Sequence, residues 1–428
     1  MLHRFLTNDQ NIDRNSYLWN MTGTMISSFQ STILLIVVTH TLSLEYAGIF
    51  SFAFANAYMF QAVGLFGMRN YQTSDVKHKY SFYDYCGSRL ITALLMVALS
   101  VGFVLYLSVT NAYTVEKSLI VFLMCILRLI DAIEDVVHGF YQQNGRLDVA
   151  GRALTIRVIV TFLCFMVLII VLKNLLAALI ATIILGMLVF ALVTKSAIGD
   201  FLTDAERKHD RKHVFSLLKT TIPVFLGLFL SIYLSNAPKY AIDGLMDNEA
   251  QAYYNFLSTP AYIITLLNSF IYNPIIYKAS NAWHDGESRV FYKIIFRQFF
   301  FIVLITAGCV GIGYLIGIPV LTFIFGTNLA AYKTEFILLL VGGGFWALTG
   351  FLVIVITIIR FQKSIGIGYI LVSAAAFFTV PMMVETTGLT GAAHVYLMIT
   401  ALLSVVFAIF LIIGLRRKGK KNREELAL

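Results

Sequence analysis

Long apolar stretches alternate with short connections along this chain of 428 residues, and its lysines and arginines gather in every second connection. A stretch that crosses the hydrocarbon core of a bilayer needs about 20 predominantly apolar residues. Short loops on the cytoplasmic side of a membrane retain Lys and Arg, whereas loops on the outer side carry few. The alternation therefore predicts a polytopic membrane protein whose connections lie on the two sides of a bilayer in turn.

The composition supports this interpretation, because 59% of the residues are hydrophobic, 13% are charged and the mean hydropathy is +0.80. Such values lie outside the range of a soluble domain. We expect an all-α fold with about 12 transmembrane helices. The predicted spans cover approximately residues 17–39, 44–68, 83–109, 118–142, 154–172, 175–194, 220–242, 250–277, 294–316, 334–359, 365–384 and 389–415.

The basic residues also predict the orientation of the chain in the membrane. If the amino terminus is cytoplasmic, 27 of the 32 lysines and arginines fall into cytoplasmic segments. The other five are Lys117, Arg128, Lys173, Lys239 and Lys333, of which Arg128 and Lys239 fall inside predicted spans. We therefore expect both termini to be cytoplasmic. The net charge of +9 is then explained by basic loops that face anionic lipid, without a nucleic-acid partner.

The longest polar connection, residues 195–219, divides the predicted spans into two groups of six. Because six is even, both groups start on the same side, which makes them parallel repeats about an axis along the membrane normal. We expect a lobe at residues 1–200, a cytoplasmic linker at 201–219, a second lobe at 220–415 and a basic cytoplasmic tail at 416–428. A substrate path would lie between the lobes, where ionisable groups can face water.

Several function classes find no support in the sequence. The outer connections are too short for an extracellular domain, and no soluble catalytic domain follows any span. A phosphate-binding loop of the form G-x-x-x-x-G-K-[ST] is absent from the sequence. The four cysteines lie at or within apolar stretches without the paired spacing of a metal site. We therefore expect no enzymatic activity, no cofactor and no metal.

The fourth predicted span contains an unusual cluster of charges: Arg128, Asp131, Glu134, Asp135 and His138. Charged side chains are costly in lipid, so the cluster requires a hydrated, paired or protein-lined environment. Helical spacing puts Arg128, Asp131, Asp135 and His138 on one face, with Arg128 near the bilayer midplane. One interpretation is a cation for an anionic head group, beside carboxylates (Asp131, Asp135, Glu134) that titrate during a transport cycle. The other is a permanent structural network.

Further candidates for substrate contact are polar and basic residues at or near the ends of spans. Lys239 either lines the outer part of a cavity or extends to the membrane interface. Arg69, at the cytoplasmic end of the second span, either meets a phosphate or is an ordinary cytoplasmic arginine. Amide and aromatic side chains suit sugar contact; they are Asn236, Tyr240 and Asn255.

Four prolines lie inside the seventh and eighth predicted spans. A proline within a span frees a backbone carbonyl and kinks the helix, as in helices that bend or gate. We therefore expect hinges at these positions, which are Pro223, Pro238, Pro260 and Pro274.

Taken together, several segments make the chain similar to Wzx-type polysaccharide flippases of the multidrug/oligosaccharidyl-lipid/polysaccharide exporter superfamily. The segments are NSYLWNMTGTMISS, GLFGMRNYQTSD, RLIDAIEDVVHGFYQQNGRLDVAGRALTIR and SNAPKYAIDG. The resemblance implies a two-lobed transporter of the bacterial plasma membrane. It implies that undecaprenyl-diphosphate-linked oligosaccharide, of capsule, exopolysaccharide or teichoic-acid type, crosses from the inner to the outer leaflet with ion-gradient coupling. It also implies membrane lipid, a polysaccharide polymerase and glycosyltransferases as partners.

Two other classes remain open from the residues. A drug or cation antiporter of the same superfamily would need only acidic residues, and Asp131 could neutralise Arg128 in such a protein. An accessory membrane protein would carry no substrate. Transport of a lipid-linked oligosaccharide by this chain alone would distinguish the three.

Overall fold

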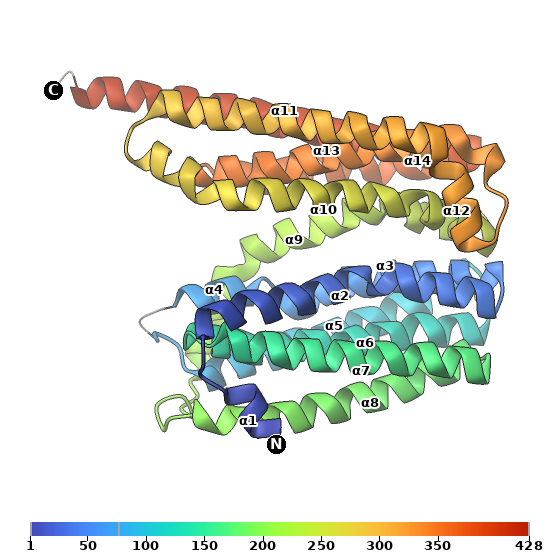
Figure 1. Cartoon of the computed structure of the whole chain (residues 1–428), viewed down its shortest axis with the longest axis horizontal. Helices are drawn as coiled ribbons and strands as arrows, with labels where there is room; N and C mark the ends of the chain where they lie inside the picture. Colours follow the sequence, from blue (N-terminus) through green and yellow to red (C-terminus); the bar gives the residue numbers. More distant parts are fainter. Residues whose placement is uncertain (1, 76–77, 427–428) are drawn as a thin grey trace. The chain divides into compact units, whose positions relative to one another are not determined.

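The computed structural model of the chain describes residues 2–75 and 78–426; the side chains of 269–271, 273, 274 and 418–426 lie outside that description. Within these ranges every regular element is a helix, as Figure 1 shows. The expected all-α fold is therefore confirmed. The chain divides into two compact units, Met1–Ile232 and Tyr233–Leu428.

Unit 1 is a bundle of long helices with two short ones. Its elements are α1 (Leu2–Thr7), α2 (Ile12–Thr41), α3 (Leu44–Leu65), α4 (Met68–Ser74), α5 (Phe82–Thr110), α6 (Val115–Gln143), α7 (Leu147–Leu172) and α8 (Leu175–Ala197). The first part of α9 (Arg211–Leu245) also belongs to it. The residues predicted to link two lobes, 201–219, thus lie within unit 1.

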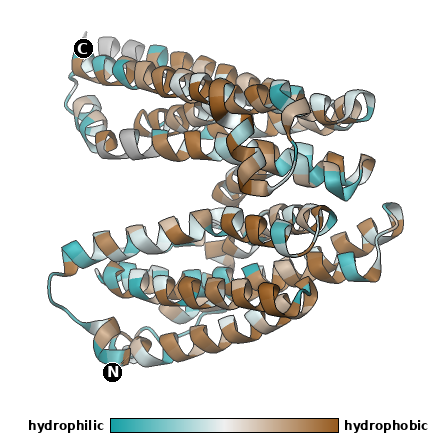
Figure 2. Cartoon of the chain, turned by 45° about the vertical axis from the view of Figure 1, so that its right-hand side comes forward, coloured by the Kyte–Doolittle hydropathy of each residue, from teal (hydrophilic) through white to brown (hydrophobic). Residues whose placement is uncertain are grey.

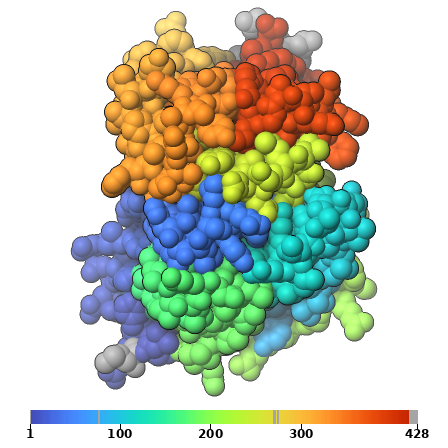
Figure 3. All heavy atoms as spheres, turned by 90° about the vertical axis from the view of Figure 1, so that its right-hand side faces the viewer, coloured from blue at the N-terminus to red at the C-terminus, as the bar shows by residue number. Residues whose placement is uncertain are grey.

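Helix α6 lies at the centre of unit 1. It packs against α3, α4, α5, α7 and α8, while α2 packs on α7. Figure 3 shows the side chains of the blue, cyan and green segments of this unit packed closely together at one end of the bundle. Because protein surrounds α6, its charged residues have polar partners on neighbouring helices instead of lipid.

Unit 2 contains the end of α9 and four long helices. They are α10 (Asn248–His284), α11 (Ser288–Ile312), α13 (Lys333–Ile358) and α14 (Lys363–Leu426); a π-helical turn, Gly313–Gly317, and the short α12 (Ile318–Phe325) follow α11. Helix α13 packs against α10, α11 and α14. Gly388 interrupts α14 with non-helical angles, φ 62° and ψ −135°, so this element consists of two helices.

The helices begin at residues that can satisfy their free amide groups. The side chains of Ser43, Thr114 and Asn174 each accept a hydrogen bond from the backbone three residues later. Ser81 and Asp84 form a capping box at the start of α5. Such caps are worth about 1 kcal/mol each, and they explain why short connections are enough to separate long apolar helices.

Among the described residues, nine helices are long and apolar enough to cross a membrane. Figure 2 shows hydrophobic residues along the middle of the helices, with hydrophilic residues more frequent towards their ends. Helices α6 and α10, with 29 and 37 residues, have the length of a span but are not among these nine. The chain is therefore a multi-pass membrane protein.

The four candidate hinge prolines lie inside continuous helices. Pro223 and Pro238 belong to α9, and Pro260 and Pro274 belong to α10. Both helices continue through these positions. The side chain of Pro274 lies outside the described residues.

Candidate functional site

The charged cluster predicted in the fourth span lies in the middle of α6. Arg128 follows the start of this 29-residue helix by about 20 Å, at about 1.5 Å per residue. Its side chain is buried, with 7% of its surface exposed. A guanidinium at this depth stays charged only with partners that replace its hydration.

Asp131 supplies such a partner to two arginines at once. Its Oδ2 accepts from Arg128 Nη1 at 2.7 Å, and its Oδ1 accepts from Arg157 Nη2 on α7 at 2.6 Å. Gln61 on α3 also donates to Oδ2, at 3.3 Å. Arg157 extends the network, because its Nε donates to Glu134 at 2.5 Å, and Glu134 contacts His138 at 3.4 Å.

Asp135 forms a second centre on the same helix. Its two oxygens lie 3.4 Å from Arg69 Nη1 and 2.8 Å from Arg89 Nη2. Arg69 on α4 donates also to Gln142, at 3.1 Å, and Arg89 on α5 donates to the carbonyl of Gly64. The sequence candidates Arg128, Asp131, Glu134, Asp135 and Arg69 are thus brought together in unit 1, on α6 and its neighbours.

The network carries more positive than negative charge. Its four arginines, at positions 69, 89, 128 and 157, face three carboxylates, at positions 131, 134 and 135. No group of three His, Cys, Asp or Glu side chains in the described part of the chain is arranged to hold a metal ion. The arrangement is thus suited to anions.

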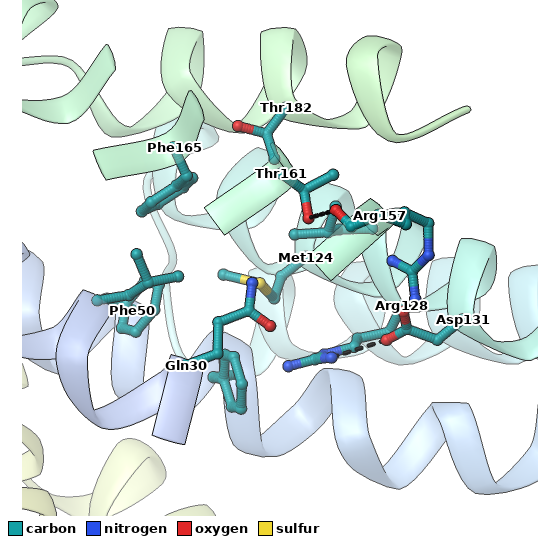
Figure 4. A pocket seen from close by; sticks show the side chains of 12 residues that line it. Gln30, Phe50, Met124, Arg128, Asp131, Arg157, Thr161, Phe165 and Thr182 are labelled. Atoms are coloured by element: carbon teal, nitrogen blue, oxygen red, sulfur yellow. Dashed lines mark hydrogen bonds and ion pairs between the residues drawn. The ribbon is translucent and has the colours of Figure 1, made fainter. Parts of the chain in front are cut away.

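A small pocket borders the network (Figure 4). Twelve residues line it: Gln30, Leu34, Phe50, Phe54, Met124, Leu127, Arg128, Asp131, Arg157, Thr161, Phe165 and Thr182. Its volume of about 20 Å³ is room for water and far too small for a sugar. A larger substrate would need a different conformation of the surrounding helices.

Arg128 keeps hydrogen-bonding capacity beside this pocket. Its guanidinium lies over the rings of Phe54 and Tyr58, with 4.4 and 4.6 Å to the centroids. The buried Nε has no hydrogen-bond partner among the described residues. Aromatic faces stabilise a guanidinium without using its N–H groups. Arg128 can therefore bind a further acceptor.

The remaining sequence candidates belong to unit 2. Tyr240 stacks on Tyr233, with 6.2 Å between centroids, and the Asn236 amide donates to Ser235 at 3.0 Å. Lys239, on the same helix, is half-buried and makes no hydrogen bond or ion pair within the described residues. Asn255 lies on α10, where its carbonyl accepts from Ser258 and Thr259. These residues lie on two helices, α9 and α10.

Two residues of the network were not selected from the sequence. Arg89 and Arg157 were counted among the cytoplasmic basic residues, because they lie close to the starts of the third and fifth predicted spans, at residues 83 and 154. The structure corrects this: α7 begins at Leu147, so Arg157 lies about 15 Å inside the helix and is 4% exposed. The sequence signal that could have placed Arg157 inside a helix is the helix-forming segment before residue 154.

A family of known proteins matches most of the chain. The family described as "Polysaccharide biosynthesis protein" matches residues 14–280, which include the complete network. No curated protein matches the sequence.

Several solved transporter structures are similar to this chain in fold. The lipid II flippase MurJ, in an inward closed conformation, is similar with a TM-score of 0.70 and 14% identity, over 95% of this chain and 87% of that chain. The MATE multidrug transporter DinF-BH is similar with 0.63 and 14%, over 95% and 96%. A MOP superfamily transporter from Pyrococcus furiosus is similar with 0.54 and 16%, over 95% of each chain. At these identities the similarity concerns the fold.

Proposed function

Because the chain belongs to the polysaccharide biosynthesis protein family, whose members are membrane transporters and not enzymes, we propose that it flips lipid-linked oligosaccharide. The substrate is an undecaprenyl-diphosphate-linked repeat unit of capsule, exopolysaccharide or teichoic-acid type. It moves from the inner to the outer leaflet of a bacterial plasma membrane. The lipid tail stays in the bilayer while the diphosphate and sugars cross through a hydrated path.

The excess of arginines over carboxylates in the unit 1 network, in which Arg89, Arg128 and Arg157 are buried, is the observation that carries this proposal. A diphosphate is anionic, and the planar fork of Arg matches its oxygens in bidentate geometry. Within the described residues, Arg89 and Arg128 each have a buried Nε without a hydrogen-bond partner, and of these two only Arg128 lines the pocket. A cation antiporter needs acidic residues that are free to bind its substrate, whereas Asp131 and Asp135 are each held by two arginines. The network therefore favours an anionic substrate.

The other candidates take supporting roles in this proposal. Arg69 meets the phosphate near the cytoplasmic end of the path, and Lys239 attracts it towards the outer end. Asn236, Tyr240 and Asn255 contact the sugars, because amides and aromatic rings suit hydroxyl groups and ring faces. We assign ion coupling to Asp131, Asp135 and Glu134 in a conformation that separates them from their arginines, and Pro223, Pro238, Pro260 and Pro274 are hinge positions for alternating access.

The topology of the proposal has twelve spans. The nine apolar helices include α14 as one span; helices α6 and α10 and the division of α14 into two parts bring the number to twelve. With both termini cytoplasmic, two six-helix lobes are parallel repeats: residues 1–200 and 220–415, with a linker at 201–219 and a cytoplasmic tail at 416–428. Glycosyltransferases act before the flipping step, and a polysaccharide polymerase acts after it.

A clean deletion in the source cell tests the proposed function. Without this protein the lipid-linked repeat unit should accumulate on the inner leaflet while its synthesis continues, because a transporter is missing and no synthetic step is lost. Accessibility of the glycan to a membrane-impermeant label, compared between intact cells and inverted vesicles, measures the leaflet. Failure of the repeat unit to assemble would contradict the proposal.

A further inference from the structure

The carboxylate of Asp131 is shared between two arginines, one at each oxygen. Arg128 on the same helix occupies Oδ2 at 2.7 Å, and Arg157 on α7 occupies Oδ1 at 2.6 Å. A partly buried carboxylate that loses one of two counter-ions still has the other. The arrangement therefore allows one arginine to leave without creating an unpaired buried charge.

The two arginines differ in how firmly they are held. Arg157 is fixed a second time, because its Nε donates to Glu134 at 2.5 Å. Arg128 makes its one ion pair, within the described residues, with Asp131. Its guanidinium lines the pocket next to the amide of Gln30, as Figure 4 shows, and its Nε has no partner. Arg128 is thus the arginine that can exchange its partner.

We propose that Arg157 is a positioning residue that keeps Asp131 compensated while Arg128 exchanges this carboxylate for a phosphate oxygen of the substrate. The inference rests on the proposed function, since it requires an anionic head group at Arg128. In the exchange Arg128 keeps an anionic partner throughout, and Asp131 keeps Arg157. Without Arg157 the carboxylate would depend on Arg128 alone, and binding of phosphate would compete with that pair.

The test uses a double variant, because Arg157→Gln alone would also strand Glu134. In Glu134→Gln/Arg157→Gln the ion pair is replaced by two neutral side chains of similar size. We expect this variant to bind inorganic pyrophosphate about tenfold more weakly than the parent protein. A tenfold loss corresponds to about 1.4 kcal/mol. Adding Asp131→Asn releases Arg128, so the triple variant should recover the affinity of the parent.

Affinity is read from the rise in melting temperature of the full chain in detergent as pyrophosphate is added at constant ionic strength. The matched control is Asp148→Asn/Arg152→Gln, which removes a buried ion pair of 3.4 Å on α7 outside the pocket. It should leave the pyrophosphate affinity unchanged.

Two results would overturn the inference: parental affinity in the double variant, or a triple variant that binds no better than the double. A separate arm tests the function on which the inference rests. If Arg128→Ala binds pyrophosphate as tightly as the parent, Arg128 is not the head-group residue, and the proposed function fails instead.

Discussion

Arg157 on α7 and Glu134 on α6 form an ion pair of 2.5 Å in which the side chains are 5% and 3% exposed. The pair joins two helices in the interior of unit 1. Breaking a buried pair by removing one partner leaves an uncompensated charge, which costs about 3–5 kcal/mol. Removal of Arg128 does not leave such an uncompensated charge, because its partner Asp131 is still paired with Arg157.

The two arginines should therefore differ in their effect on stability. We expect Arg157→Ala to lower the free energy of unfolding by about 3–5 kcal/mol and Arg128→Ala to lower it by about 1 kcal/mol. Thermal unfolding of the detergent-solubilised variants measures which of the two is less stable. Glu134→Gln should restore part of the stability that Arg157→Ala loses. Equal losses for the two single variants would contradict an arrangement in which Arg157 compensates both Glu134 and Asp131.

Lys239 is expected to serve transport at the expense of stability. A half-buried ammonium group without an ion pair gains nothing from burial, so Lys239→Met should leave the melting temperature unchanged or raise it. The same variant should slow transport, because the attraction for an anionic head group is lost. Lys333→Met is a control, since this lysine lies over the ring of Tyr314 at 3.7 Å and outside the proposed path. A loss of stability in Lys239→Met with full transport would rule out this role.

Glu206 fixes the connection between α8 and α9 to the rest of unit 1. Its Oε2 accepts from the backbone amide of Phe82 at the start of α5, at 2.6 Å, and its Oε1 lies 3.0 Å from His78. Glu206→Ala should destabilise unit 1 by about 1–2 kcal/mol, since a helix start loses its acceptor. The rate of limited proteolysis within this connection measures whether it has separated from the rest of unit 1. Asp204→Ala, at an exposed position in the same connection, should have no effect.

The basic residues predict the sidedness of the chain. Reporter fusions at Lys208, Arg289 and after Arg416 should report the cytoplasm, whereas fusions at Asn111, Asp247 and Glu385 should report the outside. An inverted result in either half of the chain would be incompatible with parallel repeats.

The apolar stretches predicted most helices because span length and composition are properties of local sequence. Helix ends were less predictable, and α7 shows the consequence. Its first turns contain Asp148, Arg152 and Arg157, which resemble a loop in composition. Ion pairs with α6 compensate the buried Arg157, whereas Asp148 and Arg152 pair with each other. Arg128, Asp131, Glu134 and Asp135 were found because they interrupt an apolar stretch. Arg157 and Arg89 were missed, because a partner on another helix leaves no trace in local sequence.

The most direct test of transport is a leaflet-resolved flipping assay in liposomes that contain only this protein and undecaprenyl-diphosphate-linked oligosaccharide. The parent protein should move the glycan across the bilayer. Arg128→Ala should abolish movement while inserting and folding normally, and Arg128→Lys should be partly active, because an ammonium group keeps the charge but loses the bidentate fork. No movement by the parent protein, or full movement by Arg128→Ala, would contradict a flippase that holds its diphosphate at Arg128.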